Sequence, residues 1–396
     1  DDDADQENLD CPLCDQKTEN IEMVEPLGFR TSYKTRDYDS SIERNFQMYE
    51  PVLEPIEGDN NDTKEIGGLT VTPYSQKNIL IMNDNKEKLF KLNEKPYLVY
   101  DESNYPEEAL DFIERQPSYM TNTESKEVAL GAMKVTDICL IKFHSEFLNK
   151  KTHILDLREV TYAQHALRSF AELYVKIAIE SLNIETGEIQ LGYQRKRFDG
   201  NLIEQVFLSD KLDNGAGYAD KLSKPEEVKK ILDRIINDIK PIWEGSWHKD
   251  CDSSCQNCLR NYDNRKVHGK LNWKLALDMA EIAYDVKYDE ERWFYGVEKK
   301  LDQFINSYSE RGFELKKLGN MFAVINSKKN VGVILTHPLW NTSKEIYWPD
   351  GLRQTFVDLS SLDGLEDIVP EDAFLDVMTF ENSPVKLFHK LMRLTQ

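Results

Sequence analysis

The chain has 396 residues, 40% hydrophobic and 31% charged, so it holds enough apolar material for packed cores and is not a wholly disordered protein. At roughly 150 residues a domain, this length favours two or three domains. The net charge of −21 argues against a surface that coats nucleic acid uniformly, and no apolar run approaches the roughly 20 residues that span a bilayer.

Much of the acidity lies at the N-terminus. Residues 1–65 contain 19 acidic and 6 basic residues and show little hydrophobic periodicity. We therefore expect an acidic, irregular segment with an exposed loop at 56–65. The segment also contains the pair Cys11-Pro-Leu-Cys14. Because two thiolates cannot satisfy a zinc ion alone, we expect this pair to form half of a second site or to share another one.

The next region is rich in short β-like runs. They predict strands at Leu69–Thr72, Ile79–Met82, Tyr97–Tyr100 and Val128–Phe143, with a short helix at 106–115. From residue 161 the apolar spacing changes to three and four residues, which predicts a helix over 161–183.

The second half alternates strands and helices. Strands are predicted at 186–194 and 203–208, and a helix at 225–241 that begins with Pro225. Further helices are predicted at 272–286, 292–310 and 384–393, and further strands at 313–317, 320–326 and 331–336.

No nucleotide-hydrolysis motif is present. The sequence has no G-x-x-x-x-G-K-[ST] loop, no D-E-x-[DH] box and no G-x-G-x-x-G after a strand. The stretch Asn214-Gly-Ala-Gly-Tyr218 favours a tight turn over a phosphate site. We therefore expect that the chain is not an enzyme by itself.

Three cysteines at ligand spacing are the most informative feature. Cys251, Cys255 and Cys258 form C-x3-C-x2-C, with spacers that suit the tight turns of a zinc knuckle. Zn2+ prefers four ligands, and we expect the fourth to be His268, ten residues past Cys258 and ahead of the helix predicted at 272–286. A site of three cysteines and one histidine has no open position and would be structural. The competing interpretations are free cysteines and a redox C-x-x-C pair.

These elements predict an α+β fold, with a mixed β-sheet and packed helices around the zinc knuckle and a smaller C-terminal α+β domain. The expected domains are 1–65, 66–287 and 288–396.

One segment resembles the helicase-associated MrfA-type zinc-binding domain. It runs from Cys251 through Tyr262 and His268 to Leu271-Asn-Trp-Lys-Leu-Ala-Leu-Asp278. The helix at 161–183 and the glycine turn after Leu208-Ser-Asp210 agree with this resemblance, which covers 130–287 well. The region around Cys11 and Cys14 resembles a segment found upstream of this domain, but more loosely. Residues 290–396 resemble these proteins only through His337-Pro-Leu-Trp340.

The resemblance implies a function. Proteins with this domain are mostly superfamily 2 DNA helicases of repair or anti-phage systems, or non-motor partners of such helicases. It implies Zn2+ as cofactor, and as partners a helicase and DNA, either single-stranded or at a duplex end. Because the chain lacks ATPase motifs, it would be an accessory subunit or a C-terminal part of a helicase.

Two details of the resemblance bear on identity and ligands. The run Trp273–Asp278 is most similar to the DrmB subunit of the DISARM anti-phage system, with the Druantia helicase as the competing match. Some relatives take the fourth ligand from a cysteine soon after the third. No cysteine follows Cys258 here, so the role passes to His268, with Cys11 or Cys14 as alternatives.

Basic residues gather around the cysteines. Candidate DNA contacts on the knuckle are Arg260, Tyr262, Arg265, Lys266, Lys270 and Lys274, and a second candidate run is Arg195, Lys196 and Arg197. The competing interpretation of both is a solvated face.

Three function classes are left open. They are a DNA-binding accessory module, an assembly scaffold that never touches DNA, and a degenerate nuclease-like domain at 290–396, for which the nearest candidate catalytic residues are Lys328, Lys329 and Glu345.

The chain opens on Asp1 with no initiator Met or signal peptide, so we expect a processed chain or part of a longer one. Clustered cysteines without a secretory signal predict a reducing compartment. The resemblance to bacterial defence proteins implies that this compartment is the bacterial cytoplasm.

Overall fold

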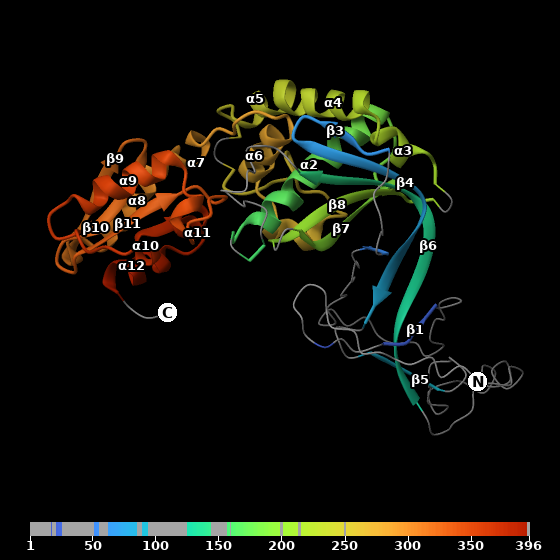
Figure 1. Ribbon diagram of the computed structural model, residues 1–396, viewed down its shortest axis with the longest axis horizontal. Coiled ribbons are helices and arrows are strands. Elements are labelled where there is room, and N and C mark those ends of the chain that lie inside the picture. The colour runs from blue at the N-terminus through green and yellow to red at the C-terminus, as the bar shows by residue number, and fades with distance from the viewer. Residues whose placement is uncertain are drawn as a thin grey trace, which may run out of the picture.

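The structure is a computed structural model. It describes residues 17, 21–25, 51–54, 62–84, 89–93, 125–143, 157–158, 160–198, 201–212, 215–248 and 251–393. The strand predicted at Tyr97–Tyr100 and the helix predicted at 106–115 lie outside these residues. Within them, the chain forms two open β-sheets with packed helices, which confirms the α+β class (Figure 1).

The larger sheet is built on two long antiparallel strands. β4 (Leu69–Asn83) pairs with β6 (Ser125–Phe143), from Leu69 opposite Phe143 to Asn83 opposite Leu130. The runs predicted at 69–72 and 79–82 are therefore one strand, interrupted by a bulge between Tyr74 and Lys77. Figure 1 shows that the far ends of β4 and β6 extend beyond the helices as a ribbon.

Shorter strands complete this sheet. A hairpin of β7 (Ile189–Phe198) and β8 (Asn201–Asp210) pairs with β6 through β8, which confirms both predicted strands. The remaining strands are β1 (Met23–Val24), β2 (Val52–Leu53), β3 (Lys64–Ile66) and β5 (Phe90–Asn93).

Helices cover the sheet near the cysteine cluster. α2 (Ala163–Leu182) confirms the predicted helix and buries its apolar face against β7, β8 and α6 (Trp273–Ala283). The Asn272 side chain caps α6 by accepting a hydrogen bond from the Lys274 N–H at 2.9 Å.

The predicted helix at 225–241 has three parts. They are α4 (Pro225–Arg234), a π-helical turn over Ile235–Ile239 and α5 (Lys240–Trp243). The short α3 (Tyr218–Leu222) precedes them. The end of α5 brings the buried Trp243 next to the cysteine cluster, because its ring stacks on His248.

The C-terminal part is a four-stranded sheet flanked by helices. The predicted helix at 292–310 is broken at Gly296, whose φ of +75° ends α7 (Glu291–Phe294) and begins α8 (Val297–Ser307). The sheet order is β12-β11-β10-β9. The other elements are β9 (Phe313–Leu318), β10 (Met321–Asn326), β11 (Val331–Thr336), α9 (Asp350–Ser360), α10 (Pro370–Ala373), β12 (Phe374–Asp376), α11 (Val377–Asn382) and α12 (Pro384–Met392).

One hydrophobic core runs through both sheet regions. The same cluster of buried side chains contains Leu277 of α6, Trp293 of α7 and Leu335 of β11. It therefore crosses the expected boundary at 287/288, whose position stays a prediction. No helix in the described part of the chain is long and apolar enough to cross a membrane.

Candidate zinc centre

Three cysteines and one histidine converge at the end of α5. The ligand atoms of His248, Cys251, Cys255 and Cys258 all lie within 4.8 Å of one another. Cys255 Sγ lies 3.7 Å from Cys258 Sγ and 3.7 Å from His248 Nε2. A tetrahedral zinc ion with Zn–S bonds of about 2.3 Å requires sulfur–sulfur separations of about 3.8 Å. The donor set and its spacing therefore fit Zn2+.

Backbone hydrogen bonds shape the knuckle. The Cys255 N–H donates to Cys258 Sγ at 3.0 Å, and the Arg260 N–H donates to the Cys255 carbonyl at 2.9 Å. Two neighbouring helices hold the knuckle from outside. Lys176 of α2 donates to the Cys258 carbonyl at 2.7 Å, and the Trp273 indole of α6 donates to the Cys251 carbonyl at 2.8 Å.

The surroundings of His248 prepare its ring for a metal. His248 is buried, and its Nδ1 lies 3.2 Å from the Trp243 carbonyl. Because the carbonyl accepts, Nδ1 carries the proton and the lone pair of Nε2 faces the cysteines. Trp243 stacks on the ring, while Trp247 and Trp273 contact it edge to face. These three indoles fix the orientation of His248.

One of the cysteines, Cys258, favours the thiolate that zinc requires. A hydrogen bond from the Cys251 thiol lowers the pKa of Cys258 to about 5, although burial opposes this shift. The same hydrogen bond raises the pKa of Cys251. Two sulfurs therefore share one proton, which a bound ion would displace.

His268 does not join this group, and the expectation that it supplies the fourth ligand is wrong. Its Nε2 donates instead to the Asn261 carbonyl at 3.0 Å and to Asn264 Oδ1 at 2.9 Å. His248 takes the position, and its signal in the sequence is an H-x2-C spacing upstream of Cys251. Cys11 and Cys14 lie outside the described residues, so their site stays a prediction.

His268 braces the loop that follows the knuckle, residues 259–270. Asn264 is buried beneath this loop and donates to the Leu259 carbonyl and to Glu172 Oε2 of α2, both at 2.8 Å. Burial raises the pKa of Glu172 to about 7, although the bond from Asn264 opposes the shift. The loop is thus tied to α2 at its centre.

The structure places most of the candidate DNA-contacting residues on this loop. Lys266 and Lys270 are exposed, and Tyr262 is 75% exposed with the Arg265 guanidinium 4.3 Å from its ring centre. Arg260 points back to Ser254 Oγ, to which its Nε donates at 2.9 Å.

The remaining candidates lie elsewhere. Lys274 sits in the first turn of α6 with its Nζ 5.1 Å from the Trp293 ring centre. On β7, Arg195 pairs with the buried Glu204 at 3.4 Å and Lys196 is exposed, while the side chain of Arg197 is not described.

The candidates for a nuclease-like site, Lys328, Lys329 and Glu345, are exposed. The knuckle is the only metal-competent His, Cys, Asp and Glu group among the described residues.

The glycine stretch forms the expected turn. The Asp210 carboxylate accepts hydrogen bonds from the N–H groups of Ala216, Gly217, Tyr218 and Ala219 at 2.5, 2.6, 3.2 and 2.8 Å. A carboxylate of the chain therefore fills the position that a phosphate would take.

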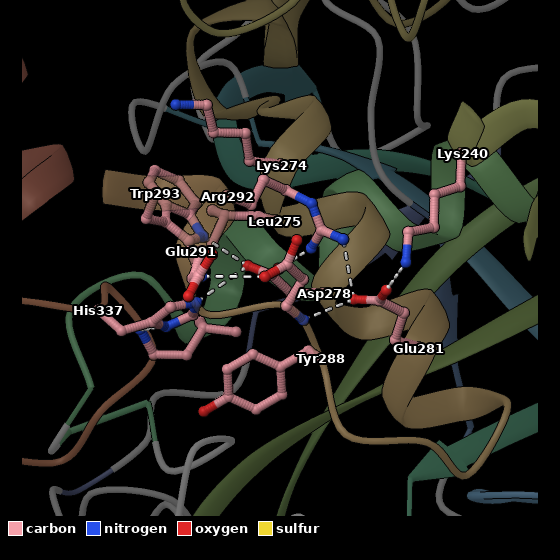
Figure 2. A network of polar contacts seen from close by, with 12 residues as sticks. Lys240, Lys274, Leu275, Asp278, Glu281, Tyr288, Glu291, Arg292, Trp293 and His337 are labelled. Carbon is pink, nitrogen blue, oxygen red and sulfur yellow. Dashed lines mark hydrogen bonds and ion pairs between the residues drawn. The ribbon is translucent and has the colours of Figure 1, made fainter. Parts of the chain in front are cut away.

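A buried ionic network joins α6 to the C-terminal sheet (Figure 2). Arg292 donates to Asp278 and, at 2.9 Å, to Glu281 Oε2, and it pairs with Glu244 at 2.8 Å. His337, just after β11, lies 3.3 Å from the other oxygen of Asp278. Burial opposes ionisation of Asp278, but Arg292 and His337 outweigh it and lower its pKa.

Comparisons with known proteins agree with the zinc site. Residues 163–259 match the family model of the MrfA Zn-binding domain. This match contains all four clustered ligands and ends before His268. Together with the group of one histidine and three cysteines, it identifies Zn2+ as the cofactor.

Two individual proteins are similar over limited stretches. A 167-residue stretch, 40% of this chain, is 28% identical to the Druantia protein DruE of Escherichia coli (strain UMEA 4076-1) and spans 8% of its length. The crystal structure of the DUF1998 helicase MrfA bound to DNA matches 59% of this chain and 25% of its own, at 12% identity and a TM-score of 0.33. The specific likeness to DrmB stays a prediction.

Proposed function

We propose that the chain is a zinc-stabilised DNA-binding accessory module that works with a superfamily 2 helicase in anti-phage defence. The observation that supports this most is the closed His248, Cys251, Cys255 and Cys258 group, which anchors a loop with exposed Lys266, Lys270 and Tyr262. A site with four protein ligands has no open position and stabilises structure rather than performing chemistry. A rigid basic loop with an exposed ring suits contact with a phosphate backbone and stacking on a base.

The names of the similar proteins support the biological setting of this proposal. One match is named as the zinc-binding domain of MrfA, and the other is a protein of the Druantia system. A role in a defence helicase complex accounts for both matches. In its more specific form, the proposal is that the chain is a DISARM-like subunit of the DrmB type. The helicase partner, rather than this chain, supplies ATP hydrolysis, because the sequence offers no phosphate-binding loop.

Salt titration of DNA binding tests the proposal. Each phosphate contact that is lost reduces the slope of log affinity against log salt by about one unit. We expect Arg265→Glu/Lys266→Glu to weaken binding of all DNA sequences equally, because phosphate contacts do not read bases. The matched control is Lys229→Glu/Lys230→Glu on exposed positions of α4, which changes the net charge equally.

Zinc content, measured in parallel, separates loss of contact from unfolding. Equal slopes and affinities in wild type and the knuckle variant would refute contact through the loop. The chain would then be an assembly scaffold, the C-terminal part of a repair or defence helicase that docks the motor without touching DNA.

A further inference from the structure

A cleft of about 780 Å³ separates the zinc knuckle from the C-terminal sheet. The knuckle contributes Cys251, the start of α6 contributes Lys274, the α7–α8 turn contributes Tyr295, and β10 contributes Phe322. This volume falls in the range of pockets that hold small ligands or single residues of a polymer. Figure 2 shows the Lys274 side chain extending away from the buried ionic network.

The cations that line the cleft differ in how they are compensated. Arg292 is held by Glu244, Asp278 and Glu281. Lys300 pairs with Glu381 at 2.8 Å and with Asp252 at 3.6 Å. Lys274 and Lys317, in contrast, have no carboxylate within ion-pair distance among the residues that the structure describes. Lys317 is exposed, with its Nζ near the Phe322 ring, whereas Lys274 is half-buried, with its Nζ over the Trp293 ring.

The position of Lys274 is costly for a cation without an anion. It lies in the first turn of α6, where the helix dipole is positive, and Asn272 already caps the neighbouring N–H groups. Burial lowers its pKa. An anionic group that enters the cleft would compensate this charge.

The other charges of the cleft limit what this anion can be. Asp289, Glu291 and Glu298 also line the cleft, so a run of phosphates would be repelled. A single phosphate beside Lys274 meets less of this repulsion than a run of phosphates, and the Tyr295 ring, 66% exposed on the cleft wall, offers a surface for a base. Because a duplex keeps its bases in the stack, a base can enter only when it is unpaired.

We propose that this cleft binds one unpaired nucleotide of a DNA strand, with Lys274 Nζ on its phosphate and Tyr295 against its base. The inference rests on the proposed DNA binding and adds that the recognised form is single-stranded.

The test compares Lys274→Met with Lys299→Met in the full chain. Methionine keeps the apolar stem over Trp293 and removes the charge, and Lys299 is an exposed lysine of α8 outside the cleft. We expect Lys274→Met to lower affinity for a single-stranded oligonucleotide about tenfold and to leave blunt duplex affinity unchanged. Lys299→Met should match wild type, and Lys274→Arg should retain single-strand affinity.

Crosslinking locates the base. An oligonucleotide with one 5-iodouracil should crosslink to Tyr295, as mapped by mass spectrometry, and Tyr295→Ala should abolish that product. If wild type binds DNA but Lys274→Met behaves like Lys299→Met, or if the crosslink maps only to Tyr262, the cleft proposal is overturned and the proposed function stands. If the wild-type chain binds no DNA, both are overturned.

Discussion

Replacing His248 by alanine is expected to cost the zinc site most of its affinity. His248 Nε2 lies 3.7 Å from Cys255 Sγ, and the ring is 2% exposed within its three-indole cage, so neither water nor another side chain can readily replace it. Changes to groups outside the ligand shell typically cost 10–100-fold in metal affinity, so loss of a ligand itself should cost at least about 100-fold, or about 3 kcal/mol. Competition with a chromogenic chelator measures this loss.

The effect on folding should be local. Zinc binding contributes about 10–16 kcal/mol to the folding of small zinc-finger peptides, but here α2 and α6 belong to a large core of their own. We therefore expect the His248→Ala knuckle to lose its order while the helices persist, as hydrogen exchange would show. His248→Cys should keep one zinc per chain, because a thiolate also serves as a ligand.

His268→Ala is the control for this experiment. It removes two hydrogen bonds inside the 259–270 loop but no atom of the ligand group, so zinc content should stay at that of wild type. The opposite pattern, with zinc lost in His268→Ala and kept in His248→Ala, would refute the assignment of the ligands.

Two further predictions concern buried charges. The pKa of Glu172 is about 7 in the fold instead of 4.5, so the native state holds the proton more tightly and stability falls as pH rises through this window. Glu172→Gln removes this titration, so the free energy of unfolding of the variant relative to wild type should be about 1–2 kcal/mol higher at pH 8 than at pH 5.5. Urea unfolding at the two pH values measures this difference, and a difference that does not change with pH would contradict the prediction. Arg292→Met leaves Asp278 buried without its arginine and Glu281 with Lys240 alone, and should cost about 3–5 kcal/mol. Lys287→Met, in an exposed pair with Glu290, should cost less than about 1 kcal/mol, and equal losses would show that burial is not the cause.

Periodicity predicted the elements that bury a regular apolar face, and missed local irregularities. The helix at 161–183 and the hairpin of β7 and β8 appear close to their expected bounds, because tertiary packing uses the faces that their spacing marks. The apolar spacing continues through the π-helical turn at Ile235–Ile239, so the sequence pattern alone predicts one continuous α-helix. The helix Asp350–Ser360 was not predicted, although it buries Leu352 and Leu359.

The metal site shows a different limit. Spacing alone indicated the three cysteines, because ligands close in sequence must be close in space. Two histidines stand at plausible spacings for the fourth ligand, His248 upstream and His268 downstream, and we expected only the second. The choice depends on the Trp243 carbonyl and on indoles from α5 and α6, which only the folded chain brings together.

Helix α6 links the features that carry the proposals. Its first residue donates from the backbone to the Ser253 carbonyl at 2.8 Å and from the indole to the Cys251 carbonyl, so the zinc knuckle fixes where the helix begins. One residue later, Lys274 faces the cleft. One turn further, Asp278 anchors Arg292 and approaches His337 of the C-terminal region. Because one rigid helix bears all three contacts, the metal site, the cleft and the buried network depend on a common geometry. Zinc at the knuckle would therefore position Lys274, the residue that the proposed strand would meet.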